Sequence, residues 1–167
     1  QPKTDTSAEE NPSDEILHQL IAAYNKGQIS TVTRECDRLI KEFPQSFLLW
    51  NLLGAANNAQ GKLEEAIAAY KKAIQLRPNF AEAHKNLAVT FSCMGNSEAA
   101  IESCKQAIKI KPDYAEAHFQ MGIALDKTGN LEAAINSYKQ AIKIKPDYAE
   151  AHNNIAVAFN DMGNPEA

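Results

Sequence analysis

The chain of 167 residues carries 17 lysines and arginines against 21 aspartates and glutamates, which gives a formal net charge of −4. This balance leaves no basic footprint for nucleic acid, so we expect no nucleic-acid partner. The longest apolar stretch, FLLWNLLGAA at residues 47–56, is interrupted by Asn51 and too short to span a bilayer, so we expect no membrane insertion.

The first twelve residues, QPKTDTSAEENP, are polar and without apolar periodicity, which predicts a disordered leader over residues 1–12. The chain starts with Gln1 instead of Met, which indicates processing or missing upstream sequence, and no apolar targeting segment follows. The three cysteines form no closely spaced pair, which favours reduced thiols and a cytoplasmic location.

A repeat of 34 residues runs through the rest of the chain. The segment KQAIKIKPDYAEAH occurs twice without a change, at residues 105–118 and 139–152. A fixed period of this length is typical of stacked helical repeats and argues against the core of a globular enzyme. The same spacing separates Pro44, Pro78, Pro112 and Pro146, and also Gly27, Gly61, Gly95, Gly129 and Gly163.

The unit at residues 81–114 shows how one repeat is expected to fold. Ala83, Leu87 and Phe91 recur every four residues and form one stripe of a first helix. Gly95 is placed to end that helix in a left-handed conformation, and Asn96 to cap a second helix. The unit therefore predicts a helix–turn–helix.

The second helix of this unit has its own apolar face, formed by Ala100, Ile101, Cys104, Ala107 and Ile108. Pro112 is expected to end it. Asp113 followed by Glu116, and likewise Asp147 followed by Glu150, predict a capping pattern at the start of the next helix. One such unit cannot bury its own apolar stripe, so neighbouring units must stack.

These residues resemble the tetratricopeptide repeat, whose signature has an aromatic near position 4, Leu-Gly at 7–8, Gly at 15, Ala at 20, an aromatic at 24, Ala at 27 and Pro at 32. Residues 47–80 fit it almost fully, with Trp50, Leu53, Gly54, Gly61, Ala66, Tyr70, Ala73 and Pro78. Residues 115–148 fit with Met121, Gly122, Gly129, Ala134, Tyr138, Ala141 and Pro146. Residues 13–46 depart most, at Ile16, Gln19, Leu20, Val32 and Cys36, and are interpreted as a divergent terminal repeat.

The resemblance implies an all-α fold, a right-handed α-solenoid of antiparallel helix pairs. Residues 13–167 are expected to form this single solenoid, with repeats at 13–46, 47–80, 81–114 and 115–148 and a partial repeat at 149–167. The final residues, GNPEA, combine a helix stop, a cap and a new first turn. They favour a native chain that continues; the alternative is a natural end with residues 149–162 as a capping helix.

Candidate catalytic and metal-binding residues are few. His84, His118 and His152 share one repeat position, and equivalent positions of stacked helices lie about 10 Å apart, too far to share one metal ion. We interpret these histidines as packing residues. Cys36 and Cys104 replace the aromatic at position 24 and are expected to be buried small hydrophobic residues.

Phosphate-binding loops, a GxSxG elbow, CxxC pairs and HExxH are absent from the sequence. No histidine lies close in register to Cys93, which argues against a Cys–His nucleophile. The lysines of the second helices are expected to form a solvated face. We therefore expect these residues to be non-catalytic, with no cofactor and no metal.

The family resemblance implies that the first helices line a concave groove. There the sequence repeats amide side chains, which suit the backbone of an extended peptide because they donate and accept hydrogen bonds. Phe119 and the aromatic residues at the repeat junctions, Phe80, Tyr114 and Tyr148, are expected to add apolar anchoring. The predicted groove residues are Asn51, Asn58, Lys85, Asn86, Phe119, Gln120, Asp126, Asn153, Asn154 and Asn160.

Three functions follow from this pattern. The leading one is a scaffold that binds an extended peptide of a protein partner in the groove. The second is the N-terminal arm of a larger enzyme, by analogy with glycosyltransferases and sulfotransferases that carry such arms. The third is a homo-oligomer formed through an open last helix, whose apolar face would be Ala151, Ile155, Ala158 and Phe159.

Overall fold

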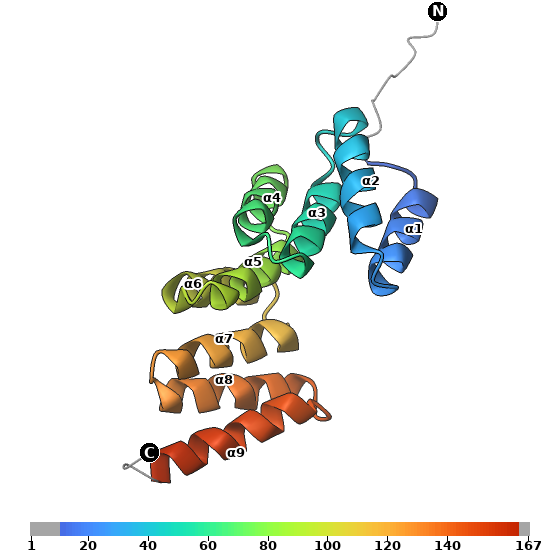
Figure 1. Ribbon diagram of the computed structural model, residues 1–167. Coiled ribbons are helices and arrows are strands. Elements are labelled where there is room, and N and C mark those ends of the chain that lie inside the picture. Colours follow the sequence, from blue (N-terminus) through green and yellow to red (C-terminus); the bar gives the residue numbers. More distant parts are fainter. Residues whose placement is uncertain (1–10, 164–167) are drawn as a thin grey trace, which may run out of the picture. The chain divides into compact units, whose positions relative to one another are not determined.

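All regular structure in the described part of the chain, residues 11–163, is helical in the computed structural model (Figure 1). These residues contain no strand, which confirms the all-α prediction. Every first helix begins within one residue of a predicted repeat boundary. The helices are α1 (Asp14–Asn25), α2 (Ile29–Glu42), α3 (Phe47–Ala59), α4 (Leu63–Leu76), α5 (Ala81–Cys93), α6 (Ser97–Ile110), α7 (Ala115–Lys127), α8 (Leu131–Ile144) and α9 (Ala149–Gly163).

The chain divides into two compact units, Gln1–Pro78 and Asn79–Ala167. In the first unit α1 packs on α2, α2 on α3 and α3 on α4. In the second unit the helices from α5 to α9 also pack in chain order, and α5 contacts α7 in addition. Figure 1 shows α7, α8 and α9 side by side. The first helices α5 and α7 of two successive repeats therefore lie next to each other, as repeat stacking requires.

The turn between α5 and α6 shows how the glycines punctuate the repeat. Gly95 has φ +77°, a left-handed conformation that a side chain would strain. The Gly95 amide donates to Ser92 and the Asn96 amide to Phe91, the paired bonds of a Schellman motif. The Asn96 side chain then accepts from the Ala99 amide at 3.1 Å and caps α6. Both sequence predictions for this turn are confirmed.

The predicted capping pattern at the repeat junctions is wrong. Tyr114 is the N-cap of α7 and makes no side-chain capping bond. The Tyr114 carbonyl instead accepts from the amides of Ala117 and His118. Asp113 lies one residue too early, because a turn closed by the Tyr114 amide and the Lys111 carbonyl delays the helix start. The helix α9 starts in the same way, at Ala149.

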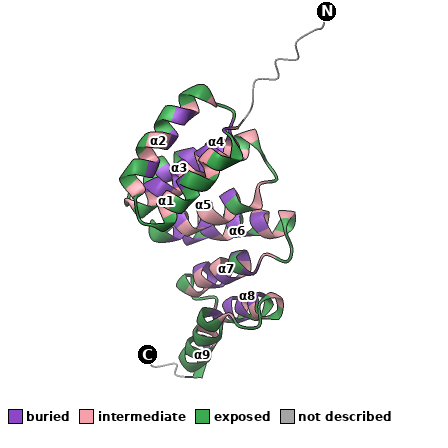
Figure 2. Ribbon diagram, turned by 90° about the vertical axis from the view of Figure 1, so that its right-hand side faces the viewer, coloured by how far each residue is buried: buried purple, intermediate pink, exposed green. Residues whose placement is uncertain are grey.

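Residues at the same repeat positions are buried along the chain, and most of them are alanines. Figure 2 shows such buried segments, in purple, on successive helices. Where the buried residue is alanine, its methyl group lets neighbouring helix backbones approach closely, so the packing depends on size as well as on apolarity. The side chains at three repeat positions are no more than 2% exposed. They are Leu49, Ala83, Ala117 and Ala151 at position 3; Val32, Ala66, Ala100 and Ala134 at position 20; and Leu39, Ala73, Ala107 and Ala141 at position 27.

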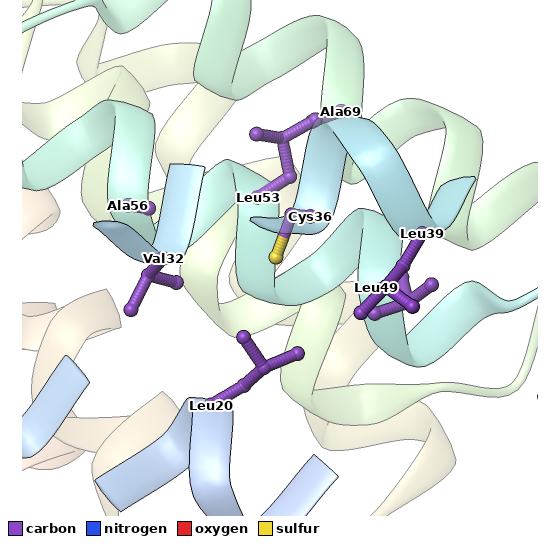
Figure 3. Close-up of a cluster of buried hydrophobic side chains, with 8 residues drawn as sticks. All are labelled: Leu20, Val32, Cys36, Leu39, Leu49, Leu53, Ala56 and Ala69. Carbon is purple, nitrogen blue, oxygen red and sulfur yellow. The ribbon is translucent and has the colours of Figure 1, made fainter. Parts of the chain in front are cut away.

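The first repeat fills its core with aliphatic side chains at positions where the later repeats have glycine or alanine. Leu20, Val32, Cys36 and Leu39 of α1 and α2 meet residues of α3 and Ala69 of α4 (Figure 3). Leu20, Val32 and Leu39 replace the small signature residues at positions 8, 20 and 27, whereas Cys36 replaces the aromatic residue at position 24. The core of the second unit gathers around Phe119, Tyr138 and Ala151.

Two glycines on first helices lie against tyrosine rings of the second helix of the same repeat. A Cβ at Gly54 would stand 2.6 Å from the Tyr70 ring, and one at Gly122 would meet the Tyr138 ring in the same way. Real Cβ contacts are never this short, so these rings pack directly on the helix backbone.

Two predictions concern the chain ends. Residues 1–10 of the expected leader, and residues 164–167 of the expected new helix, lie outside the described residues. Pro12 is buried, and the Asn11 side chain accepts a hydrogen bond from the Ser46 hydroxyl at 2.8 Å.

Candidate functional site

The predicted groove residues are distributed over both units. Asn51 and Asn58 lie on α3 in the first unit, and the others lie on α5, α7 and α9 in the second. Asn51 is only 8% exposed, and Asn58 is half-buried. Asn51 therefore offers little surface to a ligand in this conformation.

On α5 the predicted pair Lys85 and Asn86 is joined. The Lys85 ammonium donates to the Asn86 side-chain oxygen at 2.6 Å. Burial lowers the pKa of Lys85, while the carboxylates of Glu82 and Glu116 oppose the shift. Lys85 is thus a half-desolvated cation whose charge a further carboxylate would stabilise.

Phe119 on α7 is only 9% exposed and belongs to the core of the second unit. Its ring centroid lies 4.8 Å from that of Tyr148 and 5.7 Å from that of Tyr138. Such tilted contacts stabilise packed aromatic rings. Phe119 therefore packs beneath the predicted groove and offers little of its side chain to a ligand as an apolar anchor.

The remaining groove residues are half-buried or exposed. Gln120 and Asp126 on α7 are half-buried, and Asn153 and Asn160 on α9 are exposed. The Asn154 amide donates to the Tyr138 hydroxyl at 3.3 Å, which links α9 to α8.

Tyrosines at the repeat junctions pair with lysines three residues earlier. The Lys111 ammonium lies 4.9 Å from the centroid of the Tyr114 ring, and Lys145 stands at the same distance from Tyr148. Burial, aided by nearby glutamates, raises the pKa of each tyrosine to about 12. Our sequence reasoning missed these pairs, although the spacing Lys-x-x-Tyr was visible in it.

The aromatic and histidine residues at position 4 bond to the proline that ends the preceding repeat. The Trp50 indole donates to the Pro44 carbonyl at 3.0 Å. The His118 and His152 rings bond the carbonyls of Pro112 and Pro146 at 2.9 Å, so Nε2 carries the proton in both. These histidines therefore tie repeats together. Among residues 11–163 no group of three metal-ligating side chains could hold a metal ion.

The cysteines divide into two kinds. Cys36 and Cys104 are fully buried, which confirms the prediction, and burial raises the pKa of both thiols to about 12. Cys93 is exposed near the end of α5. Only this third thiol is placed to react with a reagent in solution.

The last helix buries part of the face that was expected to be open. Ala151 and Ala158 are at most 1% exposed, so the prediction that they remain open is wrong. The helix α9 packs on α8, and Ala151 belongs to the core that includes Tyr138 and Ala141 of α8. The apolar side chains left to solvent are those of Val157, Phe159 and Met162, each more than half exposed. None of the helices between residues 11 and 163 is long and apolar enough to cross a bilayer.

Solved structures of two proteins share this architecture. The crystal structure of MamA is 27% identical, with a TM-score of 0.77 over 85% of this chain and 83% of that one. The first TPR domain of Spaghetti (RPAP3), bound to an HSP90 peptide, is 24% identical, with a TM-score of 0.70 over 71% of this chain and 94% of that one. At this identity the second likeness concerns the fold alone.

Curated relatives match shorter stretches. A peroxisomal targeting signal receptor of Candida glabrata is 47% identical over 51 residues, which cover 30% of this chain and 9% of the receptor. A probable biofilm formation methyltransferase, WspC of Pseudomonas putida, is 29% identical over 76 residues, 46% of this chain and 18% of that protein. The matched stretches thus span less than a fifth of these proteins.

Family models match most of the helical region. A model described as TPR repeat matches residues 54–95 and 126–163. Two models described as tetratricopeptide repeat match residues 81–114 and 103–136. With the helix pairs described above, these matches support a protein-interaction scaffold with an all-α repeat fold. The chain belongs to the tetratricopeptide-repeat family.

Proposed function

We propose that this chain is a non-catalytic scaffold that binds an extended peptide of a partner protein along its first helices. The observation that carries the proposal is the recurrence of half-buried amides at one repeat position, in Asn86, Gln120 and Asn154. A half-buried amide is held in place by its neighbours and still reaches solvent. The backbone of an extended peptide repeats a donor and an acceptor, so a row of such amides can bind it with little demand on its sequence.

Charge adds a preference to this surface. Lys85 is half-buried, and its pKa is lowered by burial, so an added carboxylate would gain from neutralising it. The negative charges of Glu82 and Glu116 act to raise the pKa of Lys85, and both side chains are exposed to solvent. We expect peptides with a carboxylate in register with Lys85 to bind more tightly than matched amide peptides.

The test compares peptide binding by the wild type and by Asn86→Ala/Gln120→Ala. Ligands selected on a peptide array with the wild type should bind this variant about tenfold or more weakly, because two hydrogen bonds worth about 1 kcal/mol each are lost. Asn154→Ala is measured separately, since it also removes the bond to the Tyr138 hydroxyl.

The matched control removes two amides from second helices, Gln75→Ala/Gln106→Ala. This control should keep wild-type affinity, and circular dichroism should show that both double variants are folded. Equal affinities of the wild type and of Asn86→Ala/Gln120→Ala for the selected peptides would reject the proposed surface.

A second candidate is an arm that presents substrates to a catalytic domain of a longer chain. It is favoured by one observation, the 29% identity with part of a protein named as a methyltransferase. The discriminating measurement is the sequence of the gene on both sides of the region that encodes these residues. An open reading frame without a catalytic domain would dismiss this candidate.

We also propose that the exposed apolar face of α9 supports self-association. It consists of Phe159 and Met162, which are three residues apart on one side of the helix and have exposed fractions of 52% and 51%. An apolar cluster of this kind on one helix is a frequent mark of an interface.

A further inference from the structure

A cavity of about 490 Å³ lies in the second unit, among residues of α6, α7 and α8. This volume falls within the range of small-ligand and side-chain pockets. The half-buried side chains of Ile108, His118 and Met121 contribute to its lining. Met121 and Ile108 offer apolar surface, while the His118 ring nitrogen is already engaged with the Pro112 carbonyl.

The rim of this cavity is cationic. Lys105, Lys109 and Lys139 line it and are all exposed. Among the described residues that line the cavity none is acidic. Glu102 stands outside the lining, with its carboxylate 3.9 Å from the Lys105 ammonium, a surface pair of small energetic value. The Lys139 ammonium also lies 5.7 Å from the centroid of the Phe159 ring, a contact that leaves its positive charge in place. Three positive charges thus surround an apolar recess without an acidic residue in its lining.

The cavity does not belong to the surface proposed above. On α7 the predicted groove residues Phe119 and Asp126 are seven residues apart and lie on one side of the helix. His118 and Met121 are three residues apart and lie on another side, turned toward α6 and α8, whose residues complete the cavity. The two surfaces can therefore be tested separately.

The repeat before this one has no such charge pattern. Residues 34 positions earlier than Lys105, Lys109 and Lys139 are Lys71, Gln75 and Lys105. Asn136 also lines the cavity, and its earlier equivalent is Glu102, a carboxylate. The purely cationic rim is thus a feature of this pair of repeats and not of the repeat in general.

We propose that this cavity binds an acidic peptide segment of a partner protein, with one large apolar side chain in the recess and flanking carboxylates on the three lysines. Charge complementarity carries the choice of ligand. The positive charge of the three lysines is not balanced by an acidic lining residue, and carboxylates are the groups that it attracts. A single apolar side chain, buried against Met121 and Ile108, supplies the anchor.

The test uses protein labelled with ¹³C on its methionine methyl groups and three synthetic peptides. The probe peptide has Leu-Phe at its centre and two glutamates on each side. One comparison peptide has glutamine for every glutamate, and the other has alanine for Leu-Phe. The chain has three methionines, so Met94 and Met162 serve as internal controls for Met121.

We expect the probe peptide to shift the Met121 signal and to leave Met94 and Met162 in place. The two comparison peptides should bind at least about tenfold more weakly. Lys105→Gln/Lys109→Gln/Lys139→Gln should weaken the probe peptide by a similar factor. Lys62→Gln/Lys71→Gln/Lys143→Gln, with the same change in net charge, should keep wild-type affinity. All six lysines are exposed, so both variants should fold.

Three outcomes would overturn the proposal: no shift at Met121, equal binding of the glutamine peptide, or equal affinity of the two lysine variants. Decanoate is tested in parallel as a small apolar acid. A shift of Met121 by decanoate without a shift by the probe peptide would assign the cavity to a small ligand and also reject the proposal. Asn86→Ala/Gln120→Ala should bind the probe peptide as the wild type does.

Discussion

Paired residue sizes decide how the two helices of each repeat meet. Glycine at position 8 faces tyrosine at position 24 in two repeats, as Gly54 with Tyr70 and Gly122 with Tyr138. Where position 24 is a cysteine, position 8 holds a larger residue, Ala88 in one repeat and Leu20 in another. Position 8 thus carries a side chain only where position 24 has no ring to fill the space, as dense packing requires.

This pairing predicts that Gly122→Ala destabilises the protein. The new Cβ overlaps the Tyr138 ring, and overpacking of a well-filled core costs about 1–3 kcal/mol, more than the gain in helix propensity of about 1 kcal/mol. The measurement is the free energy of unfolding from urea titration, followed by circular dichroism.

The control is the pair that another repeat already uses. Gly122→Ala/Tyr138→Cys reproduces the combination found at Ala88 and Cys104, so the alanine should cost less in the presence of the cysteine than beside the tyrosine. A double-mutant cycle with no coupling between positions 122 and 138 would contradict this prediction.

The three thiols are expected to differ in reactivity. Cys36 and Cys104 are fully buried, whereas Cys93 is exposed. Ellman's reagent should therefore titrate one thiol in the native protein and three after denaturation in urea. Cys93→Ser should lose the fast reaction; a native protein that reacts at two or three sites within minutes would disprove the assignment.

Stability should fall in alkaline solution for the same reason. The pKa of Cys36 and of Cys104 is raised by burial from 9.0 to about 12. Above pH 9 the unfolded chain loses these protons while the native protein keeps them. The contribution of the thiols to the free energy of unfolding is therefore fully present below pH 9 and is lost progressively as the pH rises to about 12. Each thiol contributes a slope of at most about 1.4 kcal/mol per pH unit.

Urea titrations at several pH values between 8 and 11 measure this slope. In Cys36→Ala/Cys104→Ala the slope should be shallower, although the absolute stability will be lower. The contributions of Tyr114 and Tyr148, whose pKa values are also raised to about 12, remain in both proteins. Identical slopes would show that the thiols are not protected as the structure indicates.

At the scale of the helix, the second helices differ in how they begin. Asn96 and Asn130 cap α6 and α8 through side-chain oxygens, while Lys62 precedes α4 without a side-chain capping bond. Asn130→Ala should therefore cost about 1 kcal/mol of stability, and Lys62→Ala should cost much less. Thermal unfolding measures both, and equal losses would show that the capping bond contributes nothing.

Much of the helix arrangement along the chain could be predicted from the sequence. The 34-residue period predicts the start of each first helix to within one residue, because glycine and proline restrict the backbone locally. The capping pattern at Asp113 could not be located in the same way. The start of α7 depends on a turn between Lys111 and Tyr114, and the sequence pattern alone does not show whether Asp113 or Tyr114 is the N-cap.

At the scale of the molecule, the period identifies which residues share a helix face, but it does not give their exposure. Phe119 and Asn51 occupy the same repeat position as Lys85 and Asn153. The first two are buried, Lys85 is half-buried, and Asn153 is exposed. Their burial depends on contacts with other helices, such as that between Phe119 and Tyr148, and no pattern within one repeat contains this information. The groove residues stay a prediction for that reason.

The proposed self-association through α9 predicts a concentration-dependent mass. Light scattering should show association that Phe159→Glu/Met162→Glu abolishes, because charges at an apolar contact must be desolvated. Ile21→Glu/Met94→Glu, at exposed apolar positions outside α9, adds the same charge as a control. A monomer at all concentrations up to the millimolar range would refute this interface.

The bond from the Trp50 indole to the Pro44 carbonyl joins the second repeat to the end of the first. Trp50 is the sole tryptophan of the chain. Its emission spectrum therefore reports on one joint and on no other, so a shift toward longer wavelength marks the moment at which the first repeat detaches. The shift can be compared with the loss of the circular dichroism signal of all helices. An earlier shift would mean that unfolding begins at the first repeat, and coinciding transitions would mean that all repeats unfold together.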